Sequence, residues 1–95
     1  MDIKNIQGCD LLVKALMSLK TEEDCYAFLD DLMTKKEIID ISQRMLVAKL
    51  LSEQTIYNKI VEETGASTAT ISRVNRCYLY GTGGYKTVLS NLEEK

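Results

Sequence analysis

The side chains best suited to chemistry lie between residues 58 and 76, and they suit hydrogen bonding to a polyanion. Thr68, Ala69 and Ser72 lie at helical spacing, where one exposed face can present them together. In a nucleic acid, the edge of any base can hydrogen-bond to a hydroxyl, and the methyl group of thymine can contact a side-chain methyl group. Phosphate oxygens would be met by a second set of side chains: Asn58, Lys59, Ser67, Arg73 and Arg76. The two sets predict base and phosphate contacts, respectively, to double-stranded DNA.

Catalytic chemistry is not predicted. The chain has no histidine, and no nucleophile is paired with a base. Asp30 and Asp31 are adjacent, so on a helix they point about 100° apart and do not converge on one substrate. The three cysteines form no CxxC motif, so we expect neither a disulfide framework nor a cysteine zinc site. We expect small buried or half-buried thiols at Cys9, Cys25 and Cys77, and no metal or cofactor.

Length and composition predict one globular domain, residues 1–95. Apolar residues make up 45% and charged residues 27%, and no apolar run approaches the roughly 18 residues of a membrane-spanning helix. The N-terminus lacks the basic start and apolar stretch of a signal peptide. These features predict a cytoplasmic protein with no membrane partner.

Charge is distributed unevenly along the chain. Residues 1–31 contain seven acidic and three basic side chains, although the whole chain carries a net charge of only −2. Residues 54–80 contain three basic and two acidic side chains, so the segment that would meet DNA is mildly basic.

The elements that would position these side chains are all predicted to be helices, because proline is absent and apolar residues recur at helical spacing. A first helix would have an apolar face, and Thr21 would cap a second helix. A capping box of Thr34 and Glu37 would begin a third helix that runs to about Leu51. We expect the first face to comprise Leu11, Leu12, Ala15, Leu16 and Leu19.

The third helix has apolar residues around most of its circumference. A chain of this length offers little material to surround such a helix, so a second copy is the most economical partner. Residues 9–52 are therefore predicted to be dimerisation helices. The alternative is the central helix of a compact monomer. The apolar residues are Ile38, Ile39, Ile41, Met45, Leu46, Val47, Ala48, Leu50 and Leu51.

Residues 55–79 have the pattern of a helix-turn-helix. Thr55 would cap a short helix with Ile56 facing inward, Gly65 would end that helix in the left-handed conformation, and Ser67 would cap the next one. The spacing of apolar residues on both sides of the glycine suits two helices that cross steeply. The predicted core of the motif is Ile60, Val61, Gly65, Ala66, Ile71 and Val74.

Residues 63–73, E-T-G-A-S-T-A-T-I-S-R, resemble the helix-turn-helix of the Trp repressor superfamily, which carries a G-A-x-x-A-T-I-[ST]-R core. Residues 43–51, Q-R-M-L-V-A-K-L-L, are similar to the preceding helix in the YerC/YecD-like branch. The resemblance implies a six-helix, intertwined homodimer in which residues 68, 69 and 72 face the bases. It also implies a C-terminal helix at 84–93, which begins after glycines that end the recognition helix.

The resemblance also suggests where an effector would bind. The Trp repressor holds tryptophan with an arginine of the recognition helix, the glycine after it and a second arginine from the preceding helix. Arg73 matches the first arginine, but Val74 and Gln43 stand at the other two positions. A valine in that slot would cost about 1–3 kcal/mol, so tryptophan is a poor candidate. The candidate effector pocket comprises Gln43, Arg44, Arg73 and Cys77.

Together these features predict a sequence-specific DNA-binding transcriptional regulator that acts as a homodimer. One alternative is a protein-interaction module that keeps the fold but binds DNA weakly, because the sequence pI is about 5.1 and Glu62 and Glu63 lie near the motif. Another is a regulator gated by a small molecule other than tryptophan. Arg73 would contact a phosphate or, alternatively, form a structural ion pair.

Overall fold

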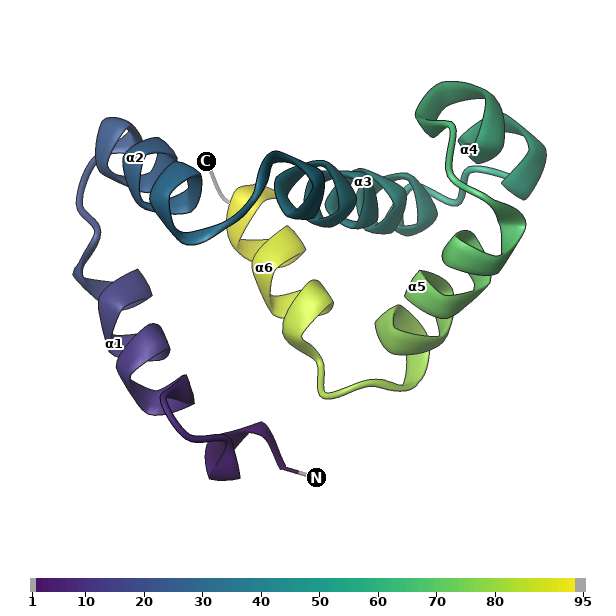
Figure 1. Cartoon of the computed structure of the whole chain (residues 1–95). Helices are drawn as coiled ribbons and strands as arrows, with labels where there is room; N and C mark the ends of the chain where they lie inside the picture. The colour runs from purple at the N-terminus through teal and green to yellow at the C-terminus, as the bar shows by residue number, and fades with distance from the viewer. Residues whose placement is uncertain (1, 94–95) are drawn as a thin grey trace. The chain divides into compact units, whose positions relative to one another are not determined.

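The computed structural model describes residues 2–93, and within this range it contains helices but no strand (Figure 1). The predicted all-α, six-helix fold is confirmed. No helix within residues 2–93 is both long and apolar enough to cross a membrane. A short 3-10 turn, η1 (Ile3–Asn5), precedes the helices α1 (Cys9–Ser18), α2 (Glu22–Leu32), α3 (Lys35–Ser52), α4 (Tyr57–Thr64), α5 (Thr68–Tyr80) and α6 (Gly84–Glu93).

The chain divides into two compact units, the first ending at Lys35 and the second beginning at Lys36. This boundary lies inside the segment 9–52 that the sequence analysis treats as one group of helices. In the first unit, the hydroxyl of Thr21 accepts a hydrogen bond from the backbone N–H of Asp24 at 3.0 Å, so the predicted cap of α2 is confirmed. None of the described residues in this unit is buried, and Leu11 is 70% exposed.

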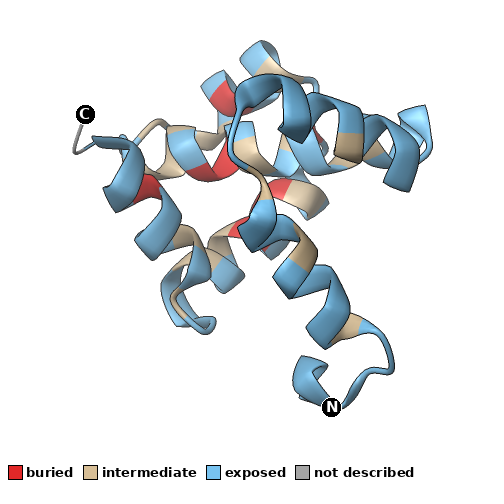
Figure 2. Cartoon of the chain, turned by 90° about the vertical axis from the view of Figure 1, so that its left-hand side faces the viewer, coloured by how far each residue is buried: buried red, intermediate tan, exposed pale blue. Residues whose placement is uncertain are grey.

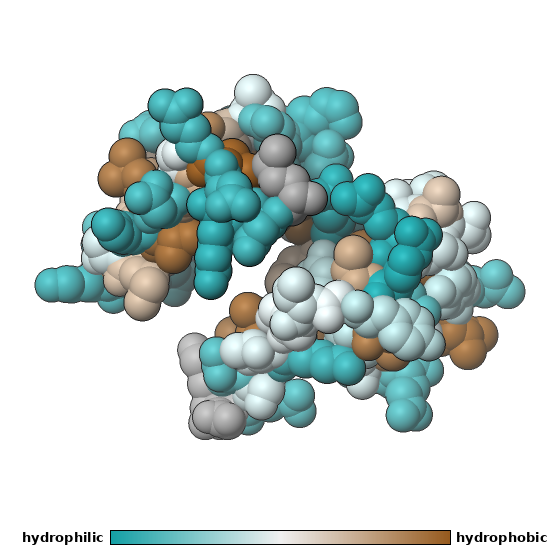
Figure 3. Space-filling view, turned by 90° about the horizontal axis from the view of Figure 1, so that it is seen from below, coloured by the Kyte–Doolittle hydropathy of each residue, from teal (hydrophilic) through white to brown (hydrophobic). Residues whose placement is uncertain are grey.

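The core lies in the second unit, where buried residues come from α3, α4, α5, α6 and the α4–α5 turn (Figure 2). Val47 and Ala48 of α3 are fully buried. Other faces of α3 stay open, because Ile39 is 65% exposed and Leu46 is 45% exposed. Figure 3 shows such apolar side chains among hydrophilic ones on the surface. The core comprises Val47, Ala48, Ile60, Ala66, Ile71, Val74 and Leu89.

The end of α5 follows the sequence prediction, because Gly81 caps it. The N–H of Gly81 donates to the carbonyl of Cys77 at 2.9 Å, and a Cβ at this glycine would collide with that same oxygen. Helix α6 then packs on α5, and the ammonium group of Lys86 lies 5.7 Å from the centroid of the Tyr78 ring.

Three sequence-based expectations are wrong. Helix α4 begins at Tyr57 after an N-cap at Ile56, so Thr55 is not its cap, and Ile56 is 69% exposed instead of facing inward. The backbone N–H of Thr55 instead donates to the carbonyl of Leu50 at 3.0 Å and so closes the end of α3. Two of the cysteines, Cys25 and Cys77, are also exposed, whereas Cys9 is half-buried as expected.

Gln54 ends α3 in the left-handed conformation, with a φ of 63°. Its N–H donates to the carbonyl of Leu51 at 2.9 Å, and with the Thr55 bond this forms a Schellman motif. For a residue with a Cβ, this conformation costs about 1–2 kcal/mol. Glycine has no such steric cost, but it loses more conformational entropy on folding. We expect Gln54→Gly to raise the free energy of unfolding by about 0.5–1 kcal/mol. Urea denaturation measures this change, and Gln54→Ala, which keeps the Cβ, should show no such gain.

Candidate nucleic-acid interface

The turn between α4 and α5 is held by its own hydrogen bonds. Gly65 adopts the predicted left-handed conformation with a φ of 73°, and its N–H donates to the carbonyl of Val61 at 2.8 Å. The hydroxyl of Thr64 donates to the carbonyl of Ile60 at 2.7 Å and accepts from the N–H of Ala66 at 3.1 Å. Both amides that follow α4 are therefore paired, so the turn sets the angle between the two helices.

Helix α5 begins as the sequence predicts. The hydroxyl of Ser67 accepts a hydrogen bond from the N–H of Thr70 at 3.1 Å, which caps the helix. Ile71 and Val74 point into the core with exposures of 0% and 2%. The 3.6-residue period then turns the residues between them outward. The exposed residues include all three of the predicted base-reading set, Thr68, Ala69 and Ser72.

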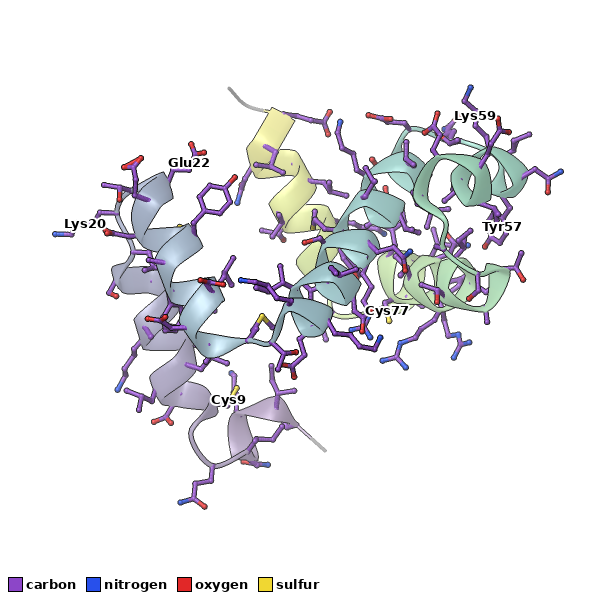
Figure 4. The ribbon with its side chains drawn as sticks, turned by 45° about the horizontal axis from the view of Figure 1, so that its top comes forward. Cys9, Lys20, Glu22, Tyr57, Lys59 and Cys77 are labelled. Carbon is purple, nitrogen blue, oxygen red and sulfur yellow. The ribbon has the colours of Figure 1, made fainter. Side chains whose placement is uncertain are left out.

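The predicted phosphate-contacting residues are also accessible. Arg73 and Arg76 are exposed on α5, and Asn58 and Lys59 are exposed on the first turn of α4. Lys59 projects outward from α4 (Figure 4). Its ammonium group lies 3.9 Å from the carboxylate of Glu63, a pairing that the sequence analysis missed although the i, i+4 spacing signals it. The hydroxyl of Ser67 already caps α5. A phosphate oxygen would therefore contact the exposed backbone at the start of this helix instead.

Four of the six predicted core residues of the motif are buried: Ile60, Ala66, Ile71 and Val74. Gly65 lies at the turn, and a Cβ placed on it would have no atom within 4 Å, so its backbone conformation, not packing, requires glycine there. Val61 differs from the prediction, because it is 36% exposed. It follows Ile60 on α4, where successive side chains point about 100° apart, and Ile60 is the one that α4 turns into the core.

The four residues of the candidate effector pocket lie in different surroundings. Gln43 is half-buried and donates from its side-chain amide to the carbonyl of Thr64 at 3.2 Å, while Arg44 and Arg73 are exposed. Cys77 does line a hollow of about 520 Å³ between α3, α5 and α6, but the other three do not. The rest of that lining was not predicted from the sequence: Met45, Gly81, Thr82, Gly84, Tyr85 and Val88.

The chain is similar to known proteins over nearly its whole length. The model of the family described as Trp repressor protein matches residues 7–93. The uncharacterized protein YerC of Bacillus subtilis (strain 168) is 48% identical over 96 residues, covering 99% of this chain and 92% of YerC. The crystal structure of a TrpR-like protein from Eubacterium eligens has a TM-score of 0.89 and 47% identity, covering 94% of this chain and 92% of that one. A proposed Trp repressor from Staphylococcus aureus has a TM-score of 0.90 and 41% identity, covering 100% and 97%.

Proposed function

Because the chain belongs to the Trp repressor family, we propose that it is a sequence-specific DNA-binding transcriptional regulator that acts as a homodimer. The observation that carries the proposal is the exposed N-terminal end of α5 on a hydrogen-bonded turn. In a helix-turn-helix protein this end of the second helix lies in the major groove. Thr68, Ala69 and Ser72 would face base edges there, and Arg73 and Arg76 would contact phosphates. No catalytic group or cofactor takes part in this function.

The homodimer accounts for the apolar surface that a single chain leaves open. The first unit buries none of its described residues, and Met17 and Tyr26 are 83% and 69% exposed. Helix α3 also presents exposed isoleucines, Ile39 and Ile41. Removing apolar surface of this kind from water is favourable. In a two-fold symmetric dimer, the second copy covers it with the same surface. A two-fold symmetric dimer would place its two recognition helices on half-sites about 34 Å apart.

The experiment that tests this function is selection of random-sequence duplex DNA by the purified protein at about 0.15 M salt, where simple charge attraction is suppressed. Enrichment of a two-fold symmetric motif supports the dimeric regulator and provides its operator. Absence of enrichment, with only salt-sensitive retention at lower salt, supports an interaction module instead. The pairing of Lys59 with Glu63 would favour that outcome, because it reduces the positive field of α4.

Replacing Thr68 with valine should change which base is preferred at one position of each half-site. Valine keeps the methyl contacts of threonine but cannot hydrogen-bond to a base edge, so the expected loss of discrimination is about 1–3 kcal/mol at that position. Competition binding with single-base operator variants measures it. Ser72→Ala should act on a neighbouring position. Equal weakening on every sequence would show that these side chains do not read bases.

A further inference from the structure

Gln43 connects α3 to the helix-turn-helix. Its side-chain amide donates to the carbonyl of Thr64 at 3.2 Å, and the two residues are 21 apart in sequence. The accepting carbonyl belongs to the last residue of α4, immediately before the turn residue Gly65. Both partners are partly buried, so water competes less for this bond than at an exposed site. The bond therefore joins the start of the turn to a neighbouring helix.

The surrounding contacts leave the turn little freedom to reorient. The N–H groups of Gly65 and Ala66 already donate to Val61 and Thr64, and Ala66 is only 2% exposed. Apolar contacts complete the attachment, because Val74 of α5 is 2% exposed in the same cluster as Val47 and Ala48 of α3. Apolar side chains of α3 and α5 are thus buried together in one cluster.

We propose that Gln43 is a positioning residue that holds the α4–α5 turn on α3, so that the protein binds DNA without a small-molecule effector. The inference rests on the proposed DNA-binding function. When only a fraction of molecules has the binding-competent arrangement, the apparent dissociation constant is the intrinsic one divided by that fraction. A turn that internal bonds already hold keeps this fraction near one. A small-molecule effector that stabilised the turn would then not lower the apparent dissociation constant for DNA.

The first test compares Gln43→Met with Ser42→Ala in the full-length protein. Methionine has a similar length and no charge but cannot donate to the Thr64 carbonyl, whereas Ser42 is an exposed neighbour on the same helix. Hydrogen exchange without DNA should show the amides of Gly65 and Ala66 exchanging about threefold to tenfold faster in Gln43→Met. Exchange at Val47 and Ala48 should not change. Ser42→Ala should match the unmodified protein throughout.

The same variants are then titrated with the selected duplex, with the melting temperature as the second measurement. A positioning role predicts a dissociation constant about threefold to tenfold weaker for Gln43→Met, while its melting temperature stays close to that of Ser42→Ala. A purely structural role would instead lower the melting temperature and leave the affinity of the folded protein unchanged. Identical turn exchange and affinity in Gln43→Met and the unmodified protein would overturn the proposal.

The second test removes bound small molecules by purifying the unmodified protein in denaturant and refolding it. The refolded protein should bind the selected duplex equally well with and without a mixture of the twenty common amino acids, tryptophan included. Binding that requires the mixture would overturn effector independence. If no duplex is bound under any condition, the proposed function fails, and turn exchange in Gln43→Met still decides whether Gln43 positions the turn.

Discussion

Raising the salt concentration from about 50 to about 200 mM is expected to weaken DNA binding by the proposed dimer roughly 10³-fold. Each protomer offers three cations beside the recognition end of α5, Lys59, Arg73 and Arg76, and all three are exposed. Cations that neutralise phosphates release condensed counterions, so the logarithm of the binding constant falls linearly with the logarithm of the salt concentration. Fluorescence anisotropy with the selected duplex at several salt concentrations measures the slope.

Arg76→Ala serves as the matched variant for this measurement. Loss of one phosphate contact should reduce the magnitude of the salt slope by about 1 per protomer, and therefore by about 2 in a dimer. Because phosphates carry no sequence information, binding should weaken to a similar extent on all sequences. A slope identical to that of the unmodified protein would remove Arg76 from the phosphate-contacting set.

Replacing Ile71 with alanine is expected to lower the free energy of unfolding by about 2–5 kcal/mol. Ile71 is fully buried in a cluster of seven buried residues within the described range 2–93, so the lost methyl and methylene groups leave a cavity that few neighbours can fill. The change should also reduce DNA binding, because the same helix carries the exposed Thr68 and Ser72.

Chemical denaturation followed by circular dichroism measures the effect of Ile71→Ala, at one protein concentration because the stability of a dimer depends on concentration. Ser72→Ala, next to it on the exposed side of α5, is the control and should change stability by less than about 0.5 kcal/mol. A loss below about 1 kcal/mol for Ile71→Ala would show that the cluster around α5 is not the core of the second unit.

Helix ends were the most predictable part of the fold. The caps at Thr21 and Ser67 accept hydrogen bonds from backbone amides three residues later, and the left-handed Gly65 ends α4. All these interactions lie within one helical turn, so neighbouring residue types are enough to specify them. The end of α3 was not predictable, because nothing in the residue types indicates that Gln54 adopts the left-handed conformation that usually favours glycine. Thr55 belongs to this helix end, so its assignment as the cap of α4 placed the start of α4 too early.

The face of α5 was also predictable, because a buried Ile71 and Val74 at helical spacing turn Thr68, Ala69 and Ser72 outward. The lining of the hollow beside Cys77 was not predictable, because it comes from α3, α5 and α6, which are separated along the chain. Only packing decides which residues of such distant helices meet.

The sequence by itself determined five helices, the helix-turn-helix pattern and the exposed N-terminal end of α5, since each follows from caps and apolar periods a few residues long, while the C-terminal helix was expected from the family resemblance. Only the tertiary structure decided that Gln43 reaches Thr64 and that Val61 stays partly exposed. It also showed that Cys77 lines a hollow without Gln43, Arg44 or Arg73. These outcomes depend on how α3 and the later helices pack, and packing joins residues whose separation along the chain carries no local signal.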